Sequence, residues 1–145
     1  MIKLQNVSKS FKGNIAIKNL NLEVKKGEIL GLLGANGAGK STTINMLLDF
    51  LNPDSGSVSI NDLDTSNNSQ ETRKLIGYIP ENVNLYPYLS GLENLDYFCM
   101  LAGLKYSKSE LENYLITCGL ASEAHVKKVS GYSKGMRQKV GIAIA

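Results

Sequence analysis

Hydrophobic and polar residues alternate along two stretches near the start of the chain, as they do in strands with one buried face. These stretches are residues 2–7 and 19–24. Residues 29–33 are apolar except for one glycine, a pattern typical of a strand that is buried on both sides. Residues 57–60 and 75–79 are predicted to form further short strands. The first half of the chain is therefore predicted to contain a sheet.

The second half of the chain carries helix signals instead. Ser90 and Ser107 each precede a glutamate by three residues, so each has the form of a capping box that opens a helix. These two helices are predicted to end towards Gly103 and at Gly119, because glycine is common just past a helix end. A last helix is predicted to begin near Ser133 and to continue to the end of the chain.

The pattern predicts two parts, a mixed sheet-and-helix region over residues 1–80 and a helical region over residues 81–145. With 145 residues, 43% hydrophobic and 20% charged, the composition is that of a soluble globular protein. No stretch approaches the ~20 apolar residues of a membrane helix. Cys99 and Cys118 lack a C-x-x-C spacing, which favours reduced thiols in a cytosolic protein. The net charge of +3 does not predict a nucleic-acid partner.

The strongest indication of function is a glycine-rich loop at residues 34–41. Its sequence, Gly-Ala-Asn-Gly-Ala-Gly-Lys-Ser, matches G-x-x-x-x-G-K-[ST] completely, between an apolar segment and a helix predicted over residues 40–51. Glycines let backbone amides approach phosphate oxygens, and the helix start adds partial positive charge. Lys40 is expected to reach the β- and γ-phosphates, Ser41 to hold Mg²⁺, and Thr42 to lie near the α-phosphate. The predicted phosphate-binding residues are Asn36, Gly37, Ala38, Gly39, Lys40, Ser41 and Thr42. The loop alone indicates a nucleotide, because kinases, GTPases and ATPases share it.

Two further segments follow the loop in order. Residues 76–81 read Ile-Gly-Tyr-Ile-Pro-Glu, and residues 129–139 read Val-Ser-Gly-Tyr-Ser-Lys-Gly-Met-Arg-Gln-Lys. With the loop, they resemble the phosphate loop, Q-loop and signature motif of the ATP-binding subunits of ABC transporters, and the resemblance covers the whole chain. It implies an α/β P-loop NTPase fold of the ABC ATPase type, with an N-terminal antiparallel β subdomain and a helical subdomain. It also implies an ATPase with ATP and Mg²⁺ as cofactors.

The resemblance implies roles for four residues outside the loop. Phe11 lies where the family stacks an aromatic ring on adenine; the alternative is a core phenylalanine on an edge strand. Glu81 replaces the usual glutamine that touches Mg²⁺ and the attacking water, and carboxylates also bind Mg²⁺; the alternative is an ordinary loop carboxylate. Ser133 and Gly135 match signature residues that contact the γ-phosphate held by a second subunit. Without the family, Ser133 is a helix N-cap.

The family also implies partners and a location. The expected partners are a membrane permease and a second copy of the subunit in a head-to-tail dimer, with the protein peripheral on the cytoplasmic face of the membrane. Tyr86, Tyr88 and Leu89 lie where such subunits receive the permease, although an apolar cluster there could equally be core. Tyr132, Lys134 and Met136 depart from the commonest signature, Leu-Ser-Gly-Gly-Gln.

The residues that complete hydrolysis in the family follow the signature: an Asp for Mg²⁺, a Glu as base and a switch His. None lies within residues 1–145, so we expect an N-terminal fragment of a longer subunit, inactive alone. In the family's sheet, two strands that come from the part of the subunit after the signature lie between residues 29–33 and residues 75–79. Without those two strands, the sheet is expected to be incomplete. His125 precedes the signature and is expected at the surface.

Three other functions are compatible with parts of this pattern. An ABC-type ATPase without transport is one; the repair branch carries a very long coiled coil, whereas only about ninety residues separate Lys40 from Ser133 here. A nucleotide-binding regulator that does not hydrolyse is a second, if Ala145 is the natural end. A small kinase is a third, but it leaves residues 129–139 unexplained.

Overall fold

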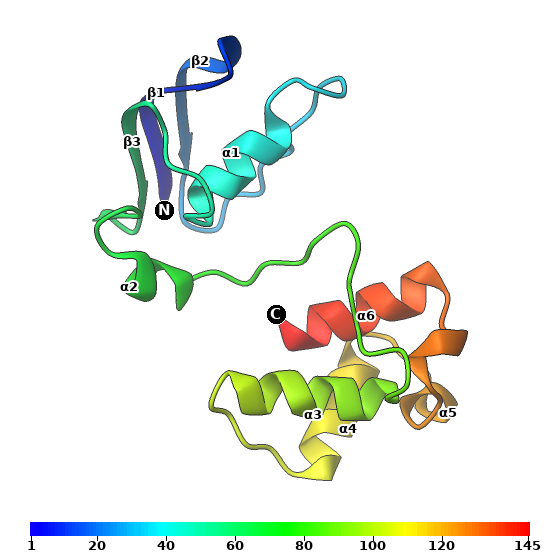
Figure 1. The fold of residues 1–145 in the computed structure, drawn as a ribbon. Helices are drawn as coiled ribbons and strands as arrows, with labels where there is room; N and C mark the ends of the chain where they lie inside the picture. The colour runs from blue at the N-terminus through cyan, green and yellow to red at the C-terminus, as the bar shows by residue number, and fades with distance from the viewer. The chain divides into compact units, whose positions relative to one another are not determined.

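The chain opens with an antiparallel hairpin in which β1 (Ile2–Phe11) pairs with β2 (Asn14–Val24). The turn residues Lys12 and Gly13 both have positive φ, 48° and 85°, as a tight two-residue hairpin turn requires. Strand β3 (Ser55–Ile60) pairs with the other edge of β1, and the two-residue strand β4 (Leu63–Asp64) pairs with β3. The sheet order is therefore β2-β1-β3-β4. Figure 1 labels the first three of these strands.

This computed structural model describes all 145 residues, which pack as two units, Met1–Ile76 and Gly77–Ala145. The first unit contains the sheet, α1 (Lys40–Leu47) and the short α2 (Ser69–Arg73), which the sequence pattern did not predict. The second contains α3 (Gly91–Leu101), α4 (Lys108–Thr117), α5 (Ser122–His125), a 3₁₀ turn at Val129–Gly131 and α6 (Lys134–Ile144). No helix of the protein combines the length and apolar character needed to cross a bilayer.

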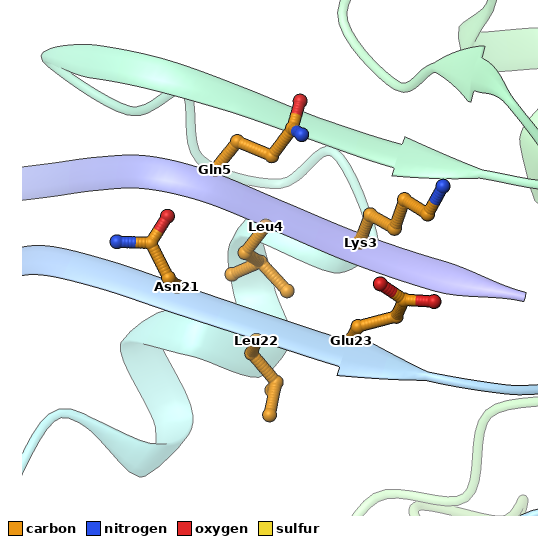
Figure 2. A pocket seen from close by; sticks show the side chains of 6 residues that line it. All are labelled: Lys3, Leu4, Gln5, Asn21, Leu22 and Glu23. Atoms are coloured by element: carbon orange, nitrogen blue, oxygen red, sulfur yellow. The ribbon is translucent and has the colours of Figure 1, made fainter.

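The first core lies between one face of the sheet and α1. Leu4 of β1 stands opposite Leu22 of β2 and Val58 of β3, and this row packs with Met46 of α1. Side chains alternate between the two faces of a strand. Figure 2 accordingly shows Leu4 and Leu22 pointing away from the polar side chains that line a hollow of about 300 Å³ on the other face. These polar residues are Lys3, Gln5, Asn21 and Glu23. The alternating pattern that predicted half-buried strands is confirmed.

Two predicted strands are wrong. Neither residues 29–33 nor residues 75–79 pair with another strand, and neither segment belongs to a helix. Ile29 and Leu33 are 98% and 92% exposed. A strand exists only where a neighbour accepts and donates its backbone hydrogen bonds, and within these 145 residues neither segment has such a neighbour. The apolar run at residues 29–33 therefore predicted a buried strand, but no other part of these 145 residues covers it.

Helix α1 is also shorter than predicted and ends at Leu47 rather than near Leu51. Asp49 adopts a left-handed φ of 55°, and the Phe50 N–H donates to the Asn45 carbonyl at 2.9 Å. This geometry closes a helix by satisfying its last carbonyls. The helix therefore stops although Phe50 and Leu51 continue the apolar pattern.

Both predicted capping boxes are confirmed in the second unit. The Ser90 hydroxyl accepts a hydrogen bond from the Glu93 N–H at 3.2 Å, and the Ser90 N–H donates to Glu93 Oε2 at 2.7 Å. Ser107 and Glu110 form the same pair at the start of α4. Gly103 and Gly119 follow the two helices with φ of 75° and 77°, a left-handed backbone that favours glycine.

The second core is formed by α3, α4, α5 and α6. Its buried members are Leu95, Leu111, Leu115, Leu120, Ala124, Val129, Tyr132 and Val140. His125, predicted at the surface, is instead only 3% exposed, so that prediction is wrong. Its Nε2 lies 3.1 Å from the Leu120 carbonyl oxygen, which can only accept, so Nε2 carries the proton. This hydrogen bond lets the imidazole take part in the core without an unsatisfied polar atom.

Replacing Leu115 by alanine should lower the free energy of unfolding by about 2–5 kcal/mol, because its side chain is fully buried and leaves a cavity. The neighbouring Ile116 is 53% exposed on the same helix, so Ile116→Ala should cost no more than about 0.5 kcal/mol. Urea unfolding of the two variants measures both values. Equal losses would contradict the assignment of the core.

Hydrogen bonds from the Ser90 N–H and then the Ser90 hydroxyl hold the pKa of Glu93 below its usual value. A lowered folded-state pKa stabilises the protein above the unfolded pKa, and this contribution is lost as pH falls through the folded value. Glu93→Gln should therefore lower Tm at about pH 7, and the difference from wild type should vanish towards about pH 3. Glu123→Gln, in a helix without a capping box, is the control. A pH-independent difference in Tm would refute the titration.

Candidate functional site

The glycine-rich loop runs directly into α1, and Gly39 is the helix N-cap with φ 85° and ψ 2°. This left-handed backbone favours glycine. A Cβ on Gly39 would lie 2.9 Å from the Ala16 carbonyl oxygen and 3.1 Å from Ile17 Cγ1. The end of the loop therefore rests directly on β2, and only a residue without a side chain permits that contact.

Lys40 folds back over the loop that precedes it. Its Nζ donates hydrogen bonds to the Gly34 carbonyl at 2.6 Å and to the Ala35 carbonyl at 2.8 Å. An ammonium has three donors, so one hydrogen remains available. The two bonds place a positive charge against the loop, and the side chain is already held there by the protein.

Most backbone N–H groups of this loop have no acceptor within the protein. Between residues 34 and 42 only the Ala38 N–H donates a hydrogen bond, to the Ala35 carbonyl at 3.1 Å. The first amides of α1 are free because a helix start has no preceding carbonyls to bind them. The first turn of α1 carries no acidic residue that would compete for them. Together with the helix dipole and the Lys40 ammonium, these amides have the chemistry that binds an anion such as phosphate.

The glycine-rich loop and the start of α1 offer a divalent metal only some of the ligands it needs. The Ser41 side chain is exposed and makes no hydrogen bond, whereas the Thr43 hydroxyl is bound to the Gly39 carbonyl at 3.0 Å. The protein has no group of three or more His, Cys, Asp or Glu residues arranged to hold a metal. The residues thus fit an ion such as Mg²⁺ that takes most of its ligands from phosphate oxygens and water.

Phe11 ends β1, opposite Asn14 at the hairpin turn. Its side chain is 45% exposed, so the alternative of a core phenylalanine is wrong. The same hairpin carries Ala16 and Ile17, which contact Gly39. The first unit therefore brings the exposed ring and the phosphate loop onto neighbouring parts of one hairpin. Lys9, whose ammonium lies 5.8 Å from the centroid of the Phe11 ring, and its partner Asp54 were missed because no sequence motif marks them.

The other predicted site residues lie in the second unit. Glu81 is exposed, and its backbone carbonyl accepts a 2.6 Å hydrogen bond from Gln138 Nε2 of α6. It shares a cavity of about 300 Å³ with Lys134 and Arg137. Ser133 is the N-cap of α6 and accepts a hydrogen bond from the Met136 N–H at 3.2 Å, which confirms the capping prediction.

Gly135 has no close neighbour except Ser133 Oγ, 3.9 Å from where its Cβ would lie. The start of α6 and Glu81 are thus close together, whereas Phe11 and the phosphate loop belong to the other unit.

Tyr132 explains one departure from the commonest signature. Its ring is only 5% exposed, its hydroxyl donates to the Ala124 carbonyl, and burial raises the pKa of this phenol. A Cβ on Gly91 would lie 2.5 Å from the Tyr132 oxygen, so α3 must start with glycine there. The Tyr132 side chain thus fills part of the core, directly before Ser133 in the chain. Sequence reasoning missed this pair because Gly91 and Tyr132 lie far apart along the chain.

The tyrosines after the Q-loop-like segment are surface residues. Tyr88 is 82% exposed and Tyr86 is 47% exposed, so the alternative of a core cluster is wrong for both. Tyr86 packs edge-to-face on Tyr97, with ring centroids 4.9 Å apart. Its backbone is held by Asn94, whose Oδ1 accepts from the Tyr86 N–H at 2.7 Å. Hydrogen bonds to Asn94 therefore hold the backbone that carries the Tyr86 ring.

The fold and the glycine-rich loop define a P-loop domain, and the comparisons agree. The family model described as ABC transporter matches residues 17–145. This chain belongs to that family, and the predicted α/β P-loop fold of the ABC ATPase type is confirmed.

Two similar proteins are the ABC transporter ATP-binding protein YdbJ of Bacillus subtilis and the bacitracin transport ATP-binding protein BcrA of Enterococcus faecalis. They are 37% and 38% identical over the whole of this chain, which covers 46% of each. The chain therefore spans about half the length of the curated relatives it matches. A dimeric ATP-binding cassette bound to ADP and Pi matches with a TM-score of 0.83 and 30% identity, over 99% of this chain and 68% of its own.

Gly39→Ala and Gly37→Ala separate the effect of the left-handed backbone from the effect of the close contact with β2. Both glycines have left-handed φ, 85° and 86°, so each alanine should cost about 1–2 kcal/mol of stability. Only the Gly39 substitution also meets neighbouring atoms, because nothing lies within 4 Å of a Cβ on Gly37. Gly39→Ala should therefore lose at least about 1 kcal/mol more than Gly37→Ala in urea unfolding. Equal losses would show that the contact with β2 does not constrain the loop.

Proposed function

We propose that this chain is the ATP-binding component of an ABC transporter, in which ATP binding and hydrolysis drive a substrate across the membrane through a partner permease. The observation that carries the proposal is the row of unpaired N–H groups between residues 34 and 42, with the Lys40 ammonium held beside it. The membership of the ABC transporter family supports the choice of ATP over other anions. Bound Mg²⁺ would neutralise phosphate charge and orient the triphosphate.

Each loop residue has a role in this proposal. The amides of Asn36, Gly37, Ala38 and Gly39 surround the phosphates, with Thr42 near the α-phosphate. Lys40 acts on the β- and γ-phosphates, where its charge stabilises the negative charge that develops during transfer. Ser41 supplies a hydroxyl ligand for Mg²⁺. Phe11 offers its exposed ring to the base.

The second unit contributes to hydrolysis in this proposal. The exposed carboxylate of Glu81 is chemically able to hold Mg²⁺ or to orient the attacking water. Ser133 and Gly135, at the start of the 11-residue helix α6, contact the γ-phosphate bound by a second copy in a head-to-tail dimer. No acidic residue stands in the first turn of α6 to repel that phosphate.

The location follows from the same proposal. The protein is peripheral on the cytoplasmic face of the membrane, where its permease partner lies. Tyr86 and Tyr88 form an exposed aromatic surface on the second unit, of a kind suited to a protein partner. Aromatic rings of this exposure bury a large area on contact, which favours association over solvation.

Lys40→Ala should weaken MgATP binding about tenfold to a hundredfold, because a charged hydrogen-bond donor to phosphate is lost. The control is Lys26→Ala, which removes the same charge from an exposed turn. Calorimetric titration of the full-length protein with MgATP measures both dissociation constants. Unchanged affinity of the Lys40 variant, with Tm preserved, would exclude this loop as the binding site.

A further inference from the structure

Asp54 connects the start of β3 to the end of β1. Its Oδ1 accepts a hydrogen bond from Lys9 Nζ at 2.7 Å, and its Oδ2 accepts one from the Ser10 N–H at 2.7 Å. The Asp54 N–H donates to the Ser8 carbonyl at 2.9 Å. The hydrogen bonds from Lys9 and then Ser10 hold the pKa of the Asp54 carboxyl below its usual value. One aspartate thus binds the three consecutive residues that lead into Phe11.

Lys9 extends this arrangement to the aromatic ring. Its side chain is only 14% exposed, and its ammonium lies over the Phe11 ring, 5.8 Å from the centroid. A cation at this distance is attracted to the face of the ring. Asp54 holds the same ammonium, so three groups form a chain from carboxylate to ammonium to ring. The cation lies over one face of Phe11, and because the residue is 45% exposed we expect the opposite face to be available to a flat ligand.

The ion pair itself is not a strong source of stability. Asp54 is 47% exposed, and an ion pair with an exposed partner contributes little to folding. Asp54 makes no hydrogen bond to the phosphate loop. The hydrogen bonds of Asp54 all involve residues 8–10, which lead into Phe11. Asp54 is therefore expected to affect the orientation of the Phe11 ring and not the binding of phosphates.

We propose that Asp54 is a positioning residue for the nucleotide base: through Lys9 and Ser10 it orders the Phe11 ring so that the free face stacks on the base of ATP. This inference rests on the proposed ATP site. A ring that is already ordered loses less side-chain freedom when the ligand binds, so affinity rises without a new contact. Asp54 should therefore affect ligands that carry a base and leave bare phosphates unaffected.

The test compares MgATP with inorganic tripolyphosphate, which has the phosphates but no base. In the full-length protein, Asp54→Asn should weaken MgATP binding about threefold to tenfold, a part of what base stacking contributes. Its affinity for tripolyphosphate should be unchanged. Lys9→Met keeps the aliphatic stem but removes the ammonium, and it should reproduce the effect. If Asp54→Asn does not fold, Lys9→Met alone decides. The control is Asp62→Asn, which removes the same charge from a 77% exposed side chain and should alter neither affinity.

A double-mutant cycle with Phe11 separates positioning from a general effect. Phe11→Ala should weaken MgATP binding roughly tenfold or more, and adding Asp54→Asn to it should have no further effect. Equal weakening of both ligands by Asp54→Asn, or additivity in the cycle, would overturn the proposal. Unchanged MgATP binding in Phe11→Ala would also overturn it, but would leave the phosphate site intact if Lys40→Ala still loses affinity. Failure of the Lys40 test would instead reject the proposed function itself.

Discussion

Backbone N–H groups that find no acceptor in their own protein are the feature on which this structure depends. Such groups are costly unless water or a ligand binds them. Between residues 34 and 42 nearly all of them are free, and Lys40 adds a cation beside them. The arrangement persists because Gly39 rests against β2 and because α1 is anchored in the core by Met46. The sheet and helix therefore hold open a loop that has little internal bonding of its own.

The predicted chemistry is divided between the two units. The phosphate loop and Phe11 belong to residues 1–76, whereas Glu81 and the helix start at Ser133 belong to residues 77–145. In the first unit Gly39 rests against β2, and in the second the buried Tyr132 directly precedes Ser133 in the chain. The departures from the commonest signature are thus of two kinds. Tyr132 is a core residue, while Lys134 is an exposed charge beside Glu81.

Local signals were predicted well because their physics acts within a few residues. The capping boxes at Ser90 and Ser107, the glycines that end two helices and the hairpin strands all depend on neighbours along the chain. Some predictions that depend on distant partners failed. Residues 29–33 carry the pattern of a buried strand but are exposed, because a strand needs another strand beside it. His125 was expected at the surface, yet the Leu120 carbonyl allows it to be buried.

The sequence by itself determined the phosphate loop, since glycine spacing, Lys40 and the following helix act through local backbone geometry. It also determined where α3, α4 and α6 begin, through serine side chains that bind amides three residues away. Only the tertiary structure decided which residues surround those local features. Asp54 meets Lys9 across 45 positions of the chain, and Tyr132 meets Gly91 across a helical core. No short pattern encodes such pairs, because they form only when separate elements pack together.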